Sequence, residues 1–425
     1  MSFSARSLSS FIVLCTSLPP ARALEPASPR IPEREFKASE LGVVADAAGP
    51  VTEALQKAID HVAAAGGGRL VIDAGSYLSG PIVLPGEFDL HLSKGATLKM
   101  LPREAGYPSD GGNYRNFIVA ANVHDLRISG EGVIDGQGES WWADYRAQRF
   151  TLRRPQIITF ERCDRVELTG ITTRNPPNTH ISLRLCREVR IDHCTLDAPG
   201  DSPNTDGINI SARNCLITGC HVSTGDDNIV ILTHAARDWQ MPISEHFVIR
   251  DCTLGAGHGM SIGSITSGGV RDVLVENCTF DRTTAGIRMK AARDRGGLVE
   301  DLTSRKLTMS GVKYPVYIAS YYPKDPKQPA DDKAAAITAT TPHWRNIRIE
   351  DLTVTEAGNS ITVWGVPEQP IEAISIRNAT FTSERGAKLF NVAGYELDNV
   401  TIKASKGAPI TTYQATGKVV EATRK

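Results

Sequence analysis

A short pattern of residues returns many times after residue 120 and constrains the fold more than any other feature of the chain. It reads apolar, any residue, apolar, two spacers, a small or apolar anchor, any residue, apolar. Alternation with a period of two, before and after a corner, is typical of two short strands. Copies begin at Leu126, Val166, Val189, Cys215, Phe247, Val273, Ile347, Ile374 and Tyr395.

Most of these copies follow one another at intervals of about 21 to 32 residues, too short for a unit that folds alone and too irregular for helical repeats. A β-sandwich would carry hairpin turns such as Asn-Gly at regular spacing, and few are present. The repeat therefore predicts an all-β chain wound as a single-stranded parallel β-helix, in which each repeat is one coil and like residues stack.

The ends of such a stack need covering, and one segment is suited to this role. Residues 50–65 place Leu55, Ala58, Ile59 and Val62 at helical spacing, and the glycines of 66–68 end the pattern. We expect an N-terminal cap at about 40–70 with a helix in it. Prolines and charges interrupt the repeat at about 323–342, which predicts an irregular exposed loop.

The first residues resemble a leader for export. Arg6 precedes an apolar stretch at 11–18, and Ala21-Arg22-Ala23 is a small-x-small cleavage sequence. We expect residues 1–23 to be a signal peptide, with a disordered tail as the alternative, and 24–425 to form one catalytic β-helix domain. No other segment has the length of apolar sequence that a membrane span needs. The expected location is therefore secreted or periplasmic.

Seven cysteines follow the leader: Cys163, Cys186, Cys194, Cys215, Cys220, Cys252 and Cys278. An odd number cannot pair completely within one molecule, and the close pairs of a zinc site are absent from the sequence. Because several occupy the anchor position, we expect small buried hydrophobes. A local disulfide between Cys215 and Cys220 is the alternative.

The polar residues that carry chemistry are placed by counting from the anchors. Asp226 follows Cys220 by six positions, and His258 follows Cys252 by six. Equal offsets in neighbouring coils stack about 5 Å apart. The preceding coil supplies Asp206, Asp227 follows Asp226 directly, and the next coil supplies Arg288 and Lys290 on one face of a strand. The sequence thus predicts one wall with three carboxylates, a histidine and two cations.

Each residue of this wall also has a simpler interpretation. The aspartates could shape turns or bind calcium, the histidine could be a solvated loop residue, and the cations could protect a strand edge. Calcium usually takes six to eight oxygens, more than these residues supply. We therefore expect no metal and no cofactor. A formal net charge of −1 without a basic run gives no indication of nucleic acid.

The same residues resemble glycoside hydrolase family 28, the polygalacturonases. The motifs are Asn204-Thr205-Asp206, Gly225-Asp226-Asp227, Gly257-His258-Gly259 and Arg288-Met289-Lys290, in the family's order and approximate spacing. The resemblance extends over nearly the whole mature chain. It implies a right-handed parallel β-helix that hydrolyses α-1,4-linked galacturonan with inversion.

The resemblance also implies roles for single residues. Asp226 would be the general acid, Asp206 and Asp227 would hold and deprotonate the attacking water, and His258 would support the acid. Asn204, Arg288 and Lys290 would bind substrate, the two cations through its carboxylate. A tyrosine near the cleaved bond is also typical of the family, and Tyr322 matches it best, with Tyr321 beside it.

Other functions remain open at this stage. A rhamnogalacturonan hydrolase ranks second. A resemblance to those enzymes would predict an altered Asn204-Thr205-Asp206 motif and an acidic variant of Gly225-Asp226-Asp227, whereas both motifs are intact here. A calcium-dependent pectate lyase and a carbohydrate-binding β-helix without activity rank lower. Attack within the polymer or from its ends is equally open. The expected partner is polygalacturonate, pectin or their oligomers, and a monomer is the default for a capped solenoid.

Overall fold

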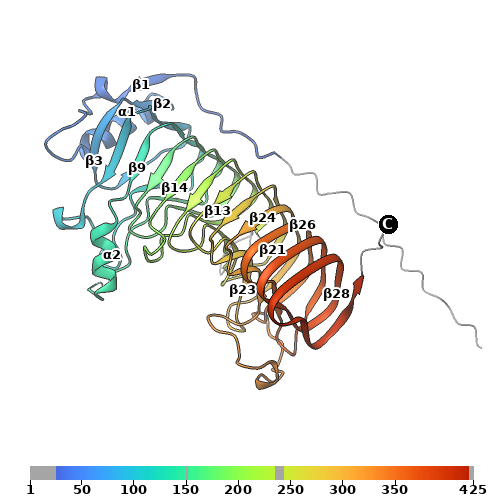
Figure 1. Cartoon of the computed structure of the whole chain (residues 1–425). Helices are drawn as coiled ribbons and strands as arrows, with labels where there is room; N and C mark the ends of the chain where they lie inside the picture. The colour runs from blue at the N-terminus through green and yellow to red at the C-terminus, as the bar shows by residue number, and fades with distance from the viewer. Residues whose placement is uncertain (1–24, 150–151, 235–243, 421–425) are drawn as a thin grey trace, which may run out of the picture.

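The computed structural model describes residues 25–149, 152–234 and 244–420, and they form one elongated coil of parallel strands (Figure 1). The predicted signal peptide, residues 1–23, lies outside the described residues. All pairings between the strands β1 to β28 are parallel, and they join into a single sheet. The all-β, parallel β-helix prediction is confirmed.

The strands stack in three ladders, which are the three faces of the coil. The first contains β1 (Glu35–Lys37), β2 (Gly68–Ile72), β5 (Phe88–Leu92), β8 (His124–Gly130), β11 (Asp164–Thr169), β18 (Ser244–Arg250) and β21 (Val270–Glu276). The second contains β3 (Gly75–Ser79), β6 (Ala96–Met100), β9 (Val133–Asp135), β12 (Thr172–Arg174), β14 (Thr195–Asp197), β16 (His221–Ser223), β19 (Thr253–Leu254) and β22 (Thr279–Asp281).

The third ladder carries the residues of interest. It contains β4 (Ile82–Val83), β7 (Ile118–Ala121), β10 (Ile158–Glu161), β17 (Ile229–Ile231), β20 (Met260–Ile262), β23 (Ala285–Lys290), β25 (Tyr314–Ala319) and β27 (Ile361–Trp364). Five longer strands bend around a corner and contribute to more than one ladder: β13 (Ile181–Asp192), β15 (Ile208–Thr218), β24 (Leu298–Ser310), β26 (His343–Asn359) and β28 (Ile371–Val420).

The corner between the first and second ladders explains the repeated pattern. A residue with positive φ stands directly before the anchor, as Asp251 does before Cys252 (φ 57°) and Asn277 before Cys278 (φ 52°). Aspartate, asparagine and glycine tolerate this left-handed conformation better than other residues do. The anchor itself then points into the core.

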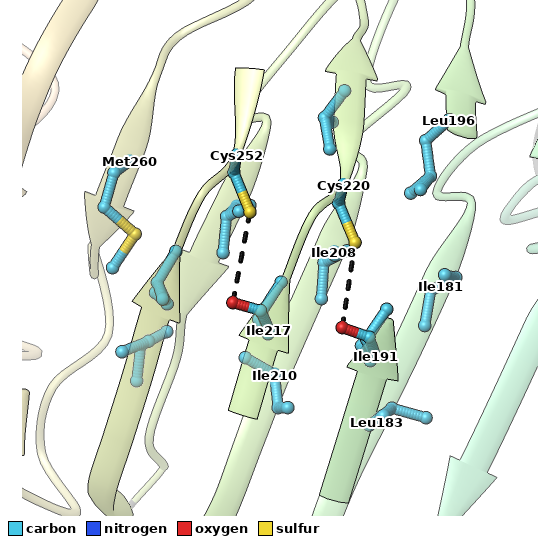
Figure 2. Packing of buried hydrophobic residues seen from close by; sticks show 14 of the residues in the cluster. Ile181, Leu183, Ile191, Leu196, Ile208, Ile210, Ile217, Cys220, Cys252 and Met260 are labelled. Carbon is cyan, nitrogen blue, oxygen red and sulfur yellow. Dashed lines mark hydrogen bonds between the residues drawn. The ribbon is translucent and has the colours of Figure 1, made fainter. Parts of the chain in front are cut away.

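The core is a set of stacked apolar rows inside the coil. Ile191, Ile217, Ile249 and Val275 pair in register along the first ladder and are buried. The cysteines join these rows: all seven are free and buried, so the expected hydrophobic role is confirmed and the alternative Cys215–Cys220 disulfide is absent. Figure 2 shows Cys220 and Cys252 packed among isoleucines, each thiol directed at a carbonyl oxygen of the preceding coil.

The helix α1 (Thr52–Ala64) packs on the N-terminal end of the coil (Figure 1). Its buried residues are Leu55, Ala58, Ile59 and Val62, as the spacing predicted. A second helix, α2 (Glu139–Arg146), projects beside β9 and was not foreseen. The remaining helical turns are η1 (Ala38–Leu41), η2 (Arg103–Ala105) and η3 (Pro329–Asp331). Residues 323–342, all described, contain no strand.

Candidate active site

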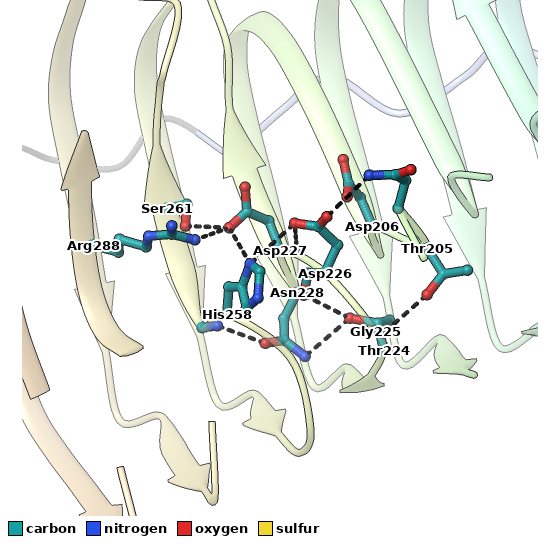
Figure 3. Close-up of polar contacts among 12 residues, drawn as sticks. Thr205, Asp206, Thr224, Gly225, Asp226, Asp227, Asn228, His258, Ser261 and Arg288 are labelled. Carbon is teal, nitrogen blue, oxygen red and sulfur yellow. Dashed lines mark hydrogen bonds and ion pairs between the residues drawn. The ribbon is translucent and has the colours of Figure 1, made fainter. Parts of the chain in front are cut away.

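The three predicted aspartates and His258 lie on turns that enter successive strands of the third ladder, and Arg288 and Lys290 lie within β23 of the same ladder. Asp206 precedes β15, Asp226 and Asp227 precede β17, and His258 precedes β20. The amide of Gly207 donates to the carbonyl of Asp227, and the amide of His258 donates to that of Asp226, both at 2.9 Å. Figure 3 shows the side chains following one another along the ladder.

Tight packing between the turns explains why glycine stands beside the aspartates. A side chain on Gly225 would collide with the backbone carbonyl of Ser202. Gly257, with φ at 129°, lies against Asn228 and the backbone of Asp226. Only glycine combines this backbone conformation with so close an approach. The glycines therefore bring the carboxylates of adjacent coils together.

Asp227 lies at the centre of the cluster and is almost fully buried. Lys290 Nζ lies 2.7 Å from its Oδ2, and Arg288 Nη1 lies 3.0 Å from its Oδ1. The hydroxyl of Ser261 donates to Oδ1 at 2.7 Å. Two cations and one hydroxyl thus satisfy both oxygens of this buried side chain.

Asp226 faces His258, whose Nδ1 lies 3.0 Å from Asp226 Oδ1. Asn204 Nδ2 lies 3.5 Å from the other oxygen, at the outer limit for a hydrogen bond. Burial acts to raise the pKa of Asp226, but His258 and Lys290 outweigh it, so the pKa lies below its ordinary value.

The pKa of Asp206 shifts in the opposite direction to that of Asp226. Burial, followed by the charges of Asp226 and Asp227, raises its pKa well above the ordinary value. The side-chain amide of Asn209 donates to its Oδ2 at 2.8 Å. Protonation is therefore favoured at Asp206 relative to Asp226.

The two tyrosines considered from the sequence have different surroundings. Tyr322 lies beside the cluster, with Lys290 Nζ 5.4 Å from its ring centroid. Tyr321 donates its hydroxyl to Asp332 at 2.7 Å and packs edge-on against Trp364. Of the two tyrosines, Tyr322 is therefore the one that lies beside Lys290.

Several residues that order the cluster were missed in the sequence. Asn228 is buried; its side chain donates to the carbonyls of Val222 and Ala256 and accepts from the amide of Gly259. Ser261 pairs in register with Arg288. Counting one coil back from Arg288 would have located Ser261, and Asn228 directly follows the aspartate pair.

Asp226, Asp227 and His258 offer ligand atoms that lie within 4.8 Å of one another, so a metal site must be considered. Calcium requires more oxygens than two carboxylates supply, and both oxygens of Asp227 already face cationic side chains. A divalent cation there would be repelled by Arg288 and Lys290. The donor set fits proton transfer better than metal binding.

Comparison with known proteins gives a consistent result. A sequence model described as glycosyl hydrolases family 28 matches residues 67–405. A probable polygalacturonase of Vitis vinifera is 29% identical over 82% of this chain and 74% of its own. An endo-polygalacturonase of Pectobacterium carotovorum subsp. carotovorum is 29% identical over 83% of this chain and 87% of its own. The structure of an exopolygalacturonase from Thermotoga maritima superposes with a TM-score of 0.76 at 25% identity, covering 89% of this chain and 94% of the other.

Proposed function

The chain belongs to glycosyl hydrolases family 28 and is a glycosidase, and from this we propose that it hydrolyses α-1,4 bonds of polygalacturonate with inversion of configuration. The observation that carries the proposal is the set of three carboxylates on adjacent turns, with two cations on the strand beyond. Neighbouring carboxylates can supply a general acid and a general base, and cations suit an acidic sugar.

In the proposed mechanism Asp226 protonates the leaving oxygen while Asp206 and Asp227 hold and deprotonate water. An inverting enzyme attacks from the opposite face of the sugar ring, with its two carboxyls about 6.5–9.5 Å apart to accommodate the water. Asp206 and Asp226 lie on the turns of neighbouring coils. Asp227, fixed by Arg288 and Lys290, would orient the water.

The proton must move to Asp226 before the bond can break, because the free protein favours it on Asp206. A substrate carboxylate near Arg288 and Lys290 would offset their positive charge, and the sugar would exclude water from Asp226. Both changes raise the pKa of Asp226. His258, with Nδ1 3.0 Å from its oxygen, would order Asp226 and support its protonation. Substrate binding would thus favour the protonated form of Asp226, which the general acid requires.

Arg288, Lys290 and Tyr322 would hold the galacturonosyl unit on one side of the bond. Arg288 remains partly exposed although it contacts Asp227, so its guanidinium can still reach a ligand. Tyr322 would cover the unit beside Lys290. Asn204, within 3.5 Å of Asp226, would contact the sugar on the other side.

We further propose that the protein is exported, acts as a monomer and has residues 24–425 as one catalytic domain. The leader-like sequence supports export. Among the residues that the structure describes, none of the helices has the length and apolarity to cross a bilayer.

The decisive experiment measures viscosity and reducing ends together on polygalacturonate. Release of reducing ends from polygalacturonate, with a saturated product, is the expected result; activity only on rhamnogalacturonan would replace the proposal with the second-ranked function. A rapid viscosity loss at little hydrolysis identifies internal attack. Reducing ends without that loss identify attack from chain ends, for which the loop at 323–342 would narrow the groove.

A further inference from the structure

Asn228 directly follows the aspartate pair and is fully buried next to the turn that carries His258. Its Nδ2 donates to the carbonyl of Val222 at 3.0 Å and to that of Ala256 at 2.7 Å. Its Oδ1 accepts from the amide of Gly259 at 2.7 Å. Both amide protons and the carbonyl oxygen of the side chain are therefore bound to backbone groups.

Two glycines flank His258, so its turn is flexible unless a neighbouring residue restrains it. Gly257 has φ at 129° and Gly259 has φ at 74°. Glycine has the greatest freedom of backbone conformation, and a histidine between two glycines can take many orientations. Asn228 bonds to Ala256 on one side of this segment and to Gly259 on the other. One side chain thus holds both ends of the segment.

The side chain of Asn228 also joins this turn to the turn of the aspartates, and Figure 3 shows it between the two. A Cβ added to Gly257 would lie 2.6 Å from Asn228 Oδ1, closer than real Cβ atoms come, so the packing on that side is tight. Towards the aspartates, Nδ2 lies 3.4 Å from Thr224 Oγ1, and that hydroxyl donates to the carbonyl of Asp226 at 3.2 Å. The spacing of the two turns therefore depends on this asparagine.

That spacing determines the contact between His258 and Asp226. The Nδ1 atom of His258 lies 3.0 Å from Oδ1 of Asp226 and 3.7 Å from Oδ1 of Asp227. The side chain of His258 is 31% exposed, so the ring can turn away from the carboxylates if its backbone is released. A displacement of about 1 Å in a catalytic arrangement can lower a rate about 100-fold.

We propose that Asn228 is a positioning residue that holds the ring of His258 against Asp226 and so controls how this carboxyl transfers its proton. The inference rests on the proposed function. The charged groups around Asp226 are Asp206, Asp227, His258 and Lys290, with Arg288 joined through Asp227. Of these groups, only His258 belongs to the segment that Asn228 holds. Asn228 therefore acts on the acid through the histidine.

The test is a double-mutant cycle of Asn228→Ala and His258→Ala, with kcat and KM measured on polygalacturonate across a range of pH. We expect Asn228→Ala to lower kcat roughly 10- to 100-fold and to leave KM within about twofold of the wild type. In the His258→Ala protein the same exchange should cost less than about threefold, because the residue through which it acts is gone. The pH profile of Asn228→Ala should shift in the same direction as that of His258→Ala.

Asn391→Ala is the matched control for the loss of a buried amide. Asn391 is 1% exposed and donates to the backbone carbonyl of Gly365 at 2.8 Å, but it lies on β28, away from the carboxylates. Thermal melts should show a loss of stability in both asparagine variants. We expect Asn391→Ala to keep the wild-type kcat, KM and pH profile, so that a change in these values reports position and not stability.

The outcomes separate this inference from the proposed function. A wild-type protein that is inactive on polygalacturonate overturns the proposed function and the inference that rests on it. If the wild type is active, a wild-type kcat and pH profile in Asn228→Ala, or losses that multiply in the double variant, overturn the positioning role alone. If melting shows that Asn228→Ala does not fold, Asn228→Ser, which keeps a hydroxyl at the position, enters the same cycle, and independent losses there refute the inference.

Discussion

Lys290 and Asp227 come from strands two coils apart, yet their charged atoms lie 2.7 Å from each other and both side chains are more than nine-tenths buried. Between them in the stack lies Ser261, which donates to the same carboxylate. The pair therefore connects the turn that carries the proposed acid, Asp226, to the strand that carries Arg288 and Lys290. In the proposed mechanism, its geometry would determine where the attacking water is held.

Breaking this pair should harm both stability and activity. Lys290→Met leaves the carboxylate of Asp227 buried with one cation fewer, which we expect to cost about 3–5 kcal/mol in unfolding free energy. Activity should fall at least about 100-fold. Chemical denaturation and initial rates measure the two effects. The double variant Lys290→Met/Asp227→Asn should recover stability but no activity; equal stability of wild type and Lys290→Met would contradict the pairing.

Replacing the proposed acid tests the chemistry without removing a buried contact of this kind. Asp226→Asn is nearly isosteric, and the loss of general acid catalysis should lower kcat about 10²- to 10⁴-fold. The matched control is Asp281→Asn, an exposed aspartate at the end of β22. Reducing-end assays and circular dichroism suffice. A turnover that survives the first exchange would refute the role of Asp226.

Asp206 should make stability depend on pH. Its folded-state pKa is raised above the ordinary value of 3.8, so its contribution to stability is complete below that pH and is lost as the pH rises through the folded pKa. Asp206→Asn removes the ionisation. We therefore expect similar melting temperatures for both proteins near pH 4 and a variant that melts roughly one to a few degrees higher at pH 7. Thermal melts across this range provide the measurement, and a variant that loses stability with rising pH as the wild type does would argue against the raised pKa.

Removal of divalent cations should leave the activity unchanged. Asp227 already faces Arg288 and Lys290, so the group formed with Asp226 and His258 does not favour a metal. Assays with and without a chelator, and with added calcium, make the comparison. A calcium requirement together with unsaturated, ultraviolet-absorbing products would instead establish a lyase.

The sequence predicted the coil and most of the wall because both depend on local periodicity. Equal distances from Cys220 and Cys252 placed Asp226 beside His258, and their backbones are hydrogen-bonded. What the repeat could not supply was the direction of long side chains. The sequence predicted that Arg288 and Lys290 would bind a substrate carboxylate. In the structure both side chains also contact the carboxylate of Asp227.

Residues outside the repeat were harder to place. Arg154 follows α2 in a segment without the coil pattern, so its contact with Asn204 depends on packing that no spacing indicates. The opposite pKa shifts of Asp206 and Asp226 could likewise not be predicted from the sequence, because they depend on burial and on distances between coils. Sequence counting gives neighbours along the stack, whereas these properties arise in three dimensions.

The stacking of coils in three ladders has a consequence for how such a molecule can change over evolutionary time. A whole coil added or deleted before residue 150 or after 345 would change the length of the β-helix. The relative positions of residues 204–290 would stay the same. The same event between Asp206 and Lys290 would separate the carboxylates from their cations. The length of polymer that the protein can contact and the chemistry of bond cleavage can therefore vary independently. The first changes with the number of coils and the second with point substitutions.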